Sequence, residues 1–218
     1  MKKNAVIFDM DGVIFDTERV YMNIWMKVYK EHNFEMTPEI YKTLIGRDKP
    51  SLIKMLGEKY GSRYNGKEMF EECEMYLKNA IDAGEVPIKE GALEIFDYLK
   101  NNGFKMAIAT SSPRTKLQMQ LKIHDLEKVF DAIICADDVT KSKPDPEIFL
   151  VAAKKLNAHP DECIVIEDSP AGIKAAYNAG ITAIHVEDLV EADDEMKRCS
   201  VKQFHSLREA QKYISELK

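Results

Sequence analysis

The chain has 218 residues, of which 45% are hydrophobic, so it can form one large domain or two smaller ones with an ordinary apolar core. Its 31 basic and 37 acidic residues give a net charge of −6, which argues against a nucleic-acid-binding protein with a basic face. No apolar run approaches the roughly 18 residues of a membrane span and no signal-peptide pattern is present, so we expect a cytoplasmic protein that binds neither nucleic acid nor membranes.

Five short apolar runs are predicted to be strands. They lie at residues 5–8, 105–109, 132–135, 163–166 and 182–186. Short apolar runs bounded by turn residues are typical of buried strands in a parallel sheet. Amphipathic segments precede or separate the last four runs and are predicted to be helices, at residues 91–100, 113–122, 146–156 and 171–178. This alternation predicts an α/β fold with a doubly wound, mostly parallel, Rossmann-like sheet.

The long interval between the first two predicted strands has a different pattern. A crossover between parallel strands needs only one helix, yet this interval holds several apolar rows at helical spacing. One row is Val20, Ile24 and Val28, with Trp25 and Tyr29 beside it. Another is Phe70, Cys73, Leu77 and Ile81, and shorter helices are predicted at 38–44 and 51–60. We therefore expect a helical cap at residues 16–82, inserted into an α/β core of residues 1–15 and 83–218. Two connections to the core suit a cap that moves as a lid.

Acidic, hydroxyl and lysine side chains follow four of the predicted strands. In open α/β sheets, ligands bind at the carboxyl ends of the strands, so we expect these side chains to face one crevice. Carboxylates without His or Cys favour Mg²⁺, whereas hydroxyls, backbone amides and a lysine suit phosphate oxygens. A carboxylate can also attack a phosphate ester, and a second one can transfer the proton. The residues concerned are Asp9, Asp11, Thr110, Ser111, Ser112, Lys143, Glu167 and Asp168.

Four segments resemble the motifs of the haloacid dehalogenase superfamily of phosphohydrolases. In chain order they are FDMDGVIFDTE, IATSS, KSKPDPEIF and VIEDSPAGIKAA, beginning at Phe8, Ile108, Lys141 and Val165. With a helical insertion between the first two motifs, the chain is similar to the subgroup that contains β-phosphoglucomutase and many sugar-phosphate phosphatases. The resemblance spans nearly the whole chain and implies a Rossmann-like catalytic core with a helical cap.

The resemblance implies catalytic and metal-binding roles for four acidic residues. Asp9 is expected to be the nucleophile and an Mg²⁺ ligand. Asp11 is expected to be the general acid and base, with its backbone carbonyl also on the metal. Asp168 is expected to be the other carboxylate ligand, and Glu167 either a ligand or a neighbour of the ligands.

The resemblance also implies residues that hold the substrate. Thr110 and the backbone amide of Ser111 are expected to bind the transferring phosphoryl group, beside which Gly12 lets the backbone turn. Lys143 is expected to lie between the charges of the nucleophile and the phosphate. In the cap, the segment LIGRDKPSL places Arg47 where it could contact a distal phosphate or hydroxyl.

Taken singly, these motifs also allow purely structural explanations. Asp9-x-Asp11-Gly is a common turn composition, Thr110-Ser111-Ser112 and Glu167-Asp168-Ser169 could each cap a helix, and Lys143-Pro144 could form a rigid helix entry. Arg47 could be a surface residue or part of an ion pair within the cap. The structural explanations do not account for the coincidence of the other motifs at the strand ends.

Residue differences within the superfamily favour one reaction. Haloacid dehalogenases lack the second acidic residue of the first motif, which is present here as Asp11. β-Phosphoglucomutase has a His in the first cap helix, where this chain has Tyr21. We therefore expect a monomeric Mg²⁺-dependent phosphatase of a small phosphorylated metabolite, a sugar or polyol phosphate. A phosphosugar mutase and a non-catalytic phosphometabolite-binding protein are the alternatives.

Overall fold

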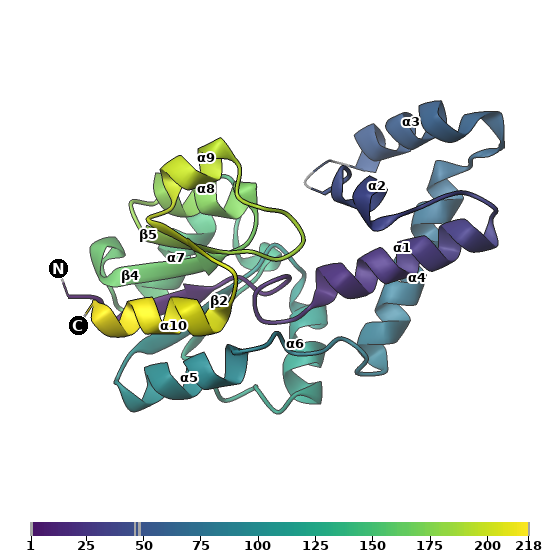
Figure 1. The fold of residues 1–218 in the computed structure, drawn as a ribbon. Coiled ribbons are helices and arrows are strands. Elements are labelled where there is room, and N and C mark those ends of the chain that lie inside the picture. The colour runs from purple at the N-terminus through teal and green to yellow at the C-terminus, as the bar shows by residue number, and fades with distance from the viewer. Residues whose placement is uncertain (1, 46, 48, 218) are drawn as a thin grey trace. The chain divides into compact units, whose positions relative to one another are not determined.

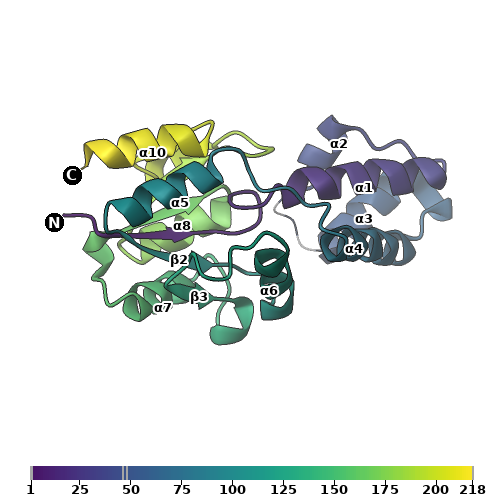
Figure 2. The ribbon, with the colours of Figure 1, turned by 90° about the horizontal axis from the view of Figure 1, so that it is seen from below.

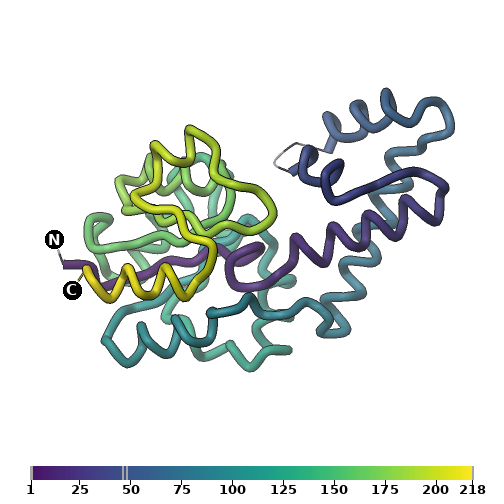
Figure 3. Tube along the Cα trace, in the orientation of Figure 1, coloured from purple at the N-terminus to yellow at the C-terminus, as the bar shows by residue number. Residues whose placement is uncertain are grey.

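The computed structural model describes residues 2–45, 47 and 49–217, and the chain divides into two compact units. One unit combines Met1–Asp16 with Pro87–Lys218, and Thr17–Val86 forms the other; Figure 3 traces the chain through both. The second connection comes four residues later than the expected boundary at 82/83. The reason is that the amides of Gly84 and Glu85 donate back to the carbonyls of Ile81 and Ala80 at 3.0 and 2.9 Å. In the described part of the chain, every helix is too short or too polar to cross a bilayer.

The first unit, which we call the α/β unit, is built on a six-stranded sheet in which every pairing is parallel. The order is β3-β2-β1-β4-β5-β6, which confirms the doubly wound α/β fold. Five strands lie where the apolar runs predicted them. The strands are β1 (Ala5–Phe8), β2 (Lys105–Ala109), β3 (Ala132–Ile134), β4 (Cys163–Glu167), β5 (Thr182–Val186) and β6 (Lys202–Phe204). The chain runs outward in both directions from the β1/β4 pair, so the crevice of the sheet lies at their carboxyl ends.

Helices cover both faces of this sheet (Figures 1 and 2). On one face, α5 (Ala92–Asn101) and α10 (Leu207–Glu216) pack against each other and the strands; on the other lie α7 (Glu147–Lys155) and α8 (Pro170–Asn178), with α9 (Asp194–Cys199) against α8. The remaining helical segments are α6 (Arg114–Ile123), η2 (Ala136–Asp138) and η3 (Pro160–Glu162). The four helices predicted in this unit begin and end within one residue of the expected bounds.

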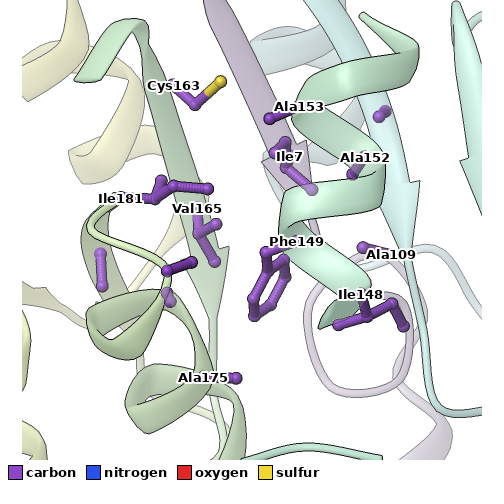
Figure 4. Close-up of a cluster of buried hydrophobic side chains, with 14 of the residues drawn as sticks. Ile7, Ala109, Ile148, Phe149, Ala152, Ala153, Cys163, Val165, Ala175 and Ile181 are labelled. Atoms are coloured by element: carbon purple, nitrogen blue, oxygen red, sulfur yellow. The ribbon is translucent and has the colours of Figure 1, made fainter. Parts of the chain in front are cut away.

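The sheet is buried on both sides, which is why its central strands are continuous apolar runs. All residues of β1 and β4 are buried. On the α7/α8 face, Phe149 lies in the same cluster as Ile7 and Val165 (Figure 4). On the opposite face, the rings of Phe8 and Phe96 meet edge to face at 5.2 Å. Because packing fixes β1 and β4 from both sides, residues just past their ends have a rigid base.

The inserted unit (Thr17–Val86) is helical, as predicted. Its elements are α1 (Thr17–Glu31), α2 (Pro38–Lys42), α3 (Lys49–Tyr60), η1 (Gly61–Arg63) and α4 (Gly66–Asp82). Trp25 of α1 stacks on Tyr29 at 5.3 Å and meets Phe70 of α4 edge to face at 4.8 Å. Of the predicted apolar row, Val28 is buried and Val20 and Ile24 are partly exposed, because the face of α1 that packs inward is centred on Trp25 and Tyr29, which were predicted to lie beside that row.

Candidate active site

Three neighbouring strands end at one level in the α/β unit. Phe8 pairs with Ile108 on one side and Ile166 on the other, so Asp9 and Glu167 are the next residues on adjacent strands. The Asp9 amide still donates to the Ile166 carbonyl at 3.0 Å. Carboxylate oxygens of Asp9, Glu167 and Asp168 lie within 4.8 Å of one another. The sheet register therefore brings together three acidic residues that are far apart in the sequence.

Lys143 places a buried ammonium group beside these carboxylates. Its Nζ donates to Asp9 Oδ1 at 2.5 Å, to Glu167 Oε1 at 2.8 Å and to the Ala109 carbonyl at 3.2 Å. Only 5% of the side chain is exposed, and the Nζ lies 4.9 Å from the centroid of the Phe149 ring. The three hydrogen bonds use all three donors of the ammonium, so Lys143 is fixed in position.

Burial and charge act in opposite directions on this group. Burial raises the pKa of Asp9 to about 7; the Lys143 ammonium works against this rise, and the Glu167 carboxylate adds to it. For Lys143, burial alone would lower the pKa, but the two carboxylates outweigh it and the pKa is raised above its usual range. Lys143 is therefore cationic at neutral pH, while Asp9 takes up a proton more readily than an ordinary aspartate.

The side chain of Glu167 occupies a space that Gly172 leaves open. Its side chain is 1% exposed, and its second oxygen, Oε2, accepts a hydrogen bond from the Ser169 amide at 2.6 Å. A Cβ atom on Gly172 of α8 would lie 1.6 Å from Glu167 Oε1. Ser169 caps α8 by accepting from the Gly172 amide at 3.1 Å, as expected. The start of α8 thus both ends the loop after β4 and makes room for Glu167.

The loop after β1 bends sharply at Gly12, which has a φ of +80°. This conformation disfavours residues with a Cβ. A Cβ on Gly12 would also lie 2.3 Å from Asp168 Oδ2 and 3.2 Å from Asp188 Oδ2. The turn expected at Gly12 is thus present, and the absence of a side chain lets two carboxylates approach the loop.

The carboxylate of Asp11 lies in a separate hydrogen-bond group. Ser112 Oγ donates to Asp11 Oδ2 at 2.7 Å, and Lys116 Nζ of α6 donates to Asp11 Oδ1 at 2.8 Å. Thr110, which is 1% exposed, accepts from the Ser112 amide at 3.0 Å. Ser111 is exposed and lines the same pocket as Lys143. The hydroxyls after β2 do not cap α6, because the Arg114 amide at its start donates to Asp137 instead, at 2.7 Å.

Comparison with known proteins shows the family. Residues 6–186 match the haloacid dehalogenase-like hydrolases. The chain belongs to this family. A phosphorylated carbohydrates phosphatase of Thermotoga maritima is 34% identical over 185 residues, which are 83% of each chain. Validoxylamine A 7'-phosphate phosphatase of Streptomyces hygroscopicus subsp. limoneus is 30% identical over 201 residues, covering 88% of this chain and 92% of the relative. These two relatives support a phosphoric monoester hydrolase as the enzyme class.

A solved structure of the family adds a second activity to the comparison. β-Phosphoglucomutase from Clostridium difficile is similar with a TM-score of 0.72 and 29% identity, covering 99% of this chain and 96% of that chain. The family predicted from the four sequence motifs is thus confirmed, and both phosphatases and a mutase are among its similar members.

One predicted site residue of this family member lies in the inserted unit. Arg47 is exposed, and its Nε donates to the Thr43 carbonyl at 3.0 Å. Its neighbours Gly46 and Asp48 in the LIGRDKPSL segment lie outside the described residues. A substrate contact by Arg47 stays a prediction.

The structure also adds residues that the sequence analysis did not single out. Lys116 and Gly172 contact predicted site residues from helices. Asp188, whose side chain is 3% exposed, lies beside Gly12 and pairs with Lys89. Asp188 comes two residues after the end of β5, so the strand-end rule that found Asp9 and Asp168 could have found it too. Lys116 and Lys89 carry no such signal.

Proposed function

We propose that this protein is a Mg²⁺-dependent phosphatase that hydrolyses a sugar or polyol phosphate through an aspartyl-phosphate. The observation that carries the proposal is the group formed by Asp9, Lys143 and Glu167 at the ends of β1 and β4. It combines a buried carboxylate able to attack phosphorus with a fixed cation beside it. The carboxylate oxygens of Glu167 and Asp168 lie within 4.8 Å of that of Asp9.

The donor set fits a divalent cation. The carboxylates of Asp9, Glu167 and Asp168 together with Lys143 carry three negative charges and one positive, a sum of −2. Oxygen ligands without His or Cys are those that Mg²⁺ prefers. We infer that Asp9, Asp168 and the Asp11 carbonyl would hold the ion, which would supply charge neutralisation at the phosphoryl oxygens. Both Glu167 oxygens already accept hydrogen bonds, from Lys143 and Ser169, so Glu167 acts by fixing Lys143.

The first half-reaction transfers the phosphoryl group to the protein. An oxygen of Asp9 forms a bond to phosphorus while the bond from phosphorus to the sugar oxygen breaks. Asp11 gives its proton to that oxygen, which leaves as an alcohol. Lys143 favours the ionised form of Asp9 and so opposes the effect of its burial, because the ammonium lies 2.5 Å from Oδ1. Thr110, the Ser111 amide and the backbone at Gly12 hold the phosphoryl oxygens.

The second half-reaction restores both side chains. Asp11, now a carboxylate, removes a proton from a water molecule as that water attacks the aspartyl-phosphate. The bond between phosphorus and Asp9 breaks, inorganic phosphate leaves, and Asp11 again carries a proton. Two carboxylates separated by one residue thus have separate roles in the two half-reactions.

The phosphatase proposal is favoured over mutase activity by Tyr21 in α1. Burial raises the pKa of Tyr21 to about 12, so its phenol does not exchange protons near neutral pH as a histidine can. The two phosphatase relatives act on phosphorylated carbohydrates and on validoxylamine A 7'-phosphate, as their names state. A polyhydroxylated phosphate monoester is therefore the substrate class that we propose.

A panel of sugar, polyol and nucleotide monophosphates tests the proposal through phosphate release with Mg²⁺ and with EDTA. We expect hydrolysis of at least one sugar or polyol phosphate, loss of activity in EDTA, and recovery with Mg²⁺. D9N should lose hydrolysis of every substrate while keeping the circular dichroism spectrum of the folded protein. Hydrolysis by D9N would refute the nucleophile. Conversion of a sugar 1-phosphate into its 6-phosphate without phosphate release would show a mutase instead.

A further inference from the structure

The Asp11 carboxylate accepts a hydrogen bond at each oxygen from one of two side chains, Lys116 and Ser112, which also bond to each other. Lys116 Nζ donates to Asp11 Oδ1 at 2.8 Å and to Ser112 Oγ at 3.2 Å, and Ser112 Oγ donates to Asp11 Oδ2 at 2.7 Å. The Lys116 and Asp11 side chains are 21% and 20% exposed. They are therefore shielded more than an ordinary surface ion pair, whose contribution is small.

The elements that carry this group are themselves fixed. Ser112 lies in the loop after β2, and Lys116 lies four residues later in the first turn of α6. The start of α6 is anchored by Arg114, whose amide donates to Asp137 at 2.7 Å and whose guanidinium donates to Asp138 at 2.5 Å. Lys116 thus approaches Asp11 from a rigid helix start rather than from a mobile loop.

We propose that Lys116 is a positioning residue for proton transfer by Asp11, an inference that rests on the proposed phosphatase function. An ammonium has only donors, so Lys116 holds Oδ1 as an acceptor throughout the reaction. The Ser112 hydroxyl can donate or accept, so it tolerates either protonation state at Oδ2. Oδ2 is then the oxygen that gives its proton to the leaving alcohol and later takes one from water.

A comparison of substrates with different leaving groups distinguishes this positioning role from a purely structural role. An alkoxide needs a proton as the phosphorus–oxygen bond breaks, whereas 4-nitrophenolate is a good leaving group without one. The quantity to compare is kcat/KM, which covers the steps through this bond cleavage. K116M should lower kcat/KM about 30-fold for the best sugar or polyol phosphate in the panel, and less than about 3-fold for 4-nitrophenyl phosphate.

Two further variants complete the experiment. K122M makes the same substitution at an exposed lysine of the same helix and should leave both kcat/KM values within about 2-fold of the wild type. D11N should show the same dependence on leaving group as K116M, with a larger loss. In the double variant D11N/K116M, the second substitution should add less than about 2-fold, because Lys116 acts through Asp11.

The outcomes separate the inference from the function on which it rests. Equal losses on the two substrates in K116M, or no loss on either, would overturn the role of Lys116 and leave the phosphatase proposal standing. Additive losses in D11N/K116M would overturn it as well. A wild-type protein that hydrolyses neither substrate with Mg²⁺ would refute the phosphatase proposal and this role with it. Retained turnover of 4-nitrophenyl phosphate by K116M also shows that the variant is folded.

Discussion

Replacing Gly172 with Ala should destabilise the protein although glycine is a poor helix residue. Gly172 lies inside α8 and has no positive φ, so on helix propensity alone G172A would stabilise by about 1 kcal/mol. The new Cβ would however lie 1.6 Å from Oε1 and 2.0 Å from Cδ of Glu167. No small shift relieves such an overlap, so the Glu167 side chain must leave its position.

The expected magnitude follows from what Glu167 then loses. It is 1% exposed and accepts from Lys143 at 2.8 Å and from the Ser169 amide at 2.6 Å. Breaking a buried ion pair costs about 3–5 kcal/mol, and subtracting the propensity gain leaves a net loss of about 2–4 kcal/mol. Since Lys143 also loses one of the two carboxylates that fix it, phosphate hydrolysis should fall together with stability.

Gly57 is the matched control, because it also lies inside a helix but meets almost nothing. The atom nearest to a Cβ at Gly57 is Cδ1 of Tyr64, at 4.0 Å. G57A should therefore be as stable as the wild type or up to about 1 kcal/mol more stable. Urea unfolding followed by circular dichroism measures both variants. G172A with wild-type stability and activity would refute the argument that Gly172 exists to make room for Glu167.

The remaining predictions concern the metal and the buried lysine. Because burial raises the pKa of Asp9 to about 7, a proton competes with the metal below that pH. Mg²⁺ affinity of the metal-free protein should therefore rise with pH up to about 7 and level off above it, which calorimetry measures together with proton release; a pH-independent affinity would contradict the site. K143M should lower the free energy of unfolding of the metal-free protein by about 3–5 kcal/mol, seen as a lower melting temperature, because Asp9 and Glu167 then face each other without the ammonium. It should also lower kcat at least about 100-fold. K141M, two residues away and exposed, should change neither, and similar effects in both variants would contradict the assignment.

The parts of the fold that can be predicted from sequence are those in which one physical cause dominates. Burial on both faces makes β1 and β4 continuous apolar runs, so the pattern places both strands correctly. β6 escapes prediction because its residues Lys202 and Gln203 are exposed at the sheet edge, where burial imposes no pattern. α10 is also absent from the predicted elements, although Ser206 caps it and its apolar residues recur at helical spacing. That signal is present in the sequence.

Some residues of the candidate site can likewise be predicted from the sequence, and others cannot. Residues that follow a strand end share one crevice whatever the details of packing, so Asp9, Glu167 and Asp168 can be grouped from the sequence alone. Whether a helix residue reaches back to that crevice depends on where the helix lies, and no local pattern in α6 shows that Lys116 contacts Asp11. The motif around Gly172 predicts only a helix start, because the space that this glycine leaves is visible only in three dimensions.

Gly12 and Gly172 show how one residue type serves the same site for two different reasons. Gly12 combines a φ of +80° with a carboxylate that a Cβ would meet at 2.3 Å, so backbone conformation and space act together. Gly172 has an ordinary helical backbone, and only the Glu167 side chain excludes a larger residue. The glycine inside α8 is therefore explained by a side chain that occupies the space it leaves, whereas Gly57 inside α3 has no such neighbour. Here that side chain is the one that holds Lys143 against Asp9.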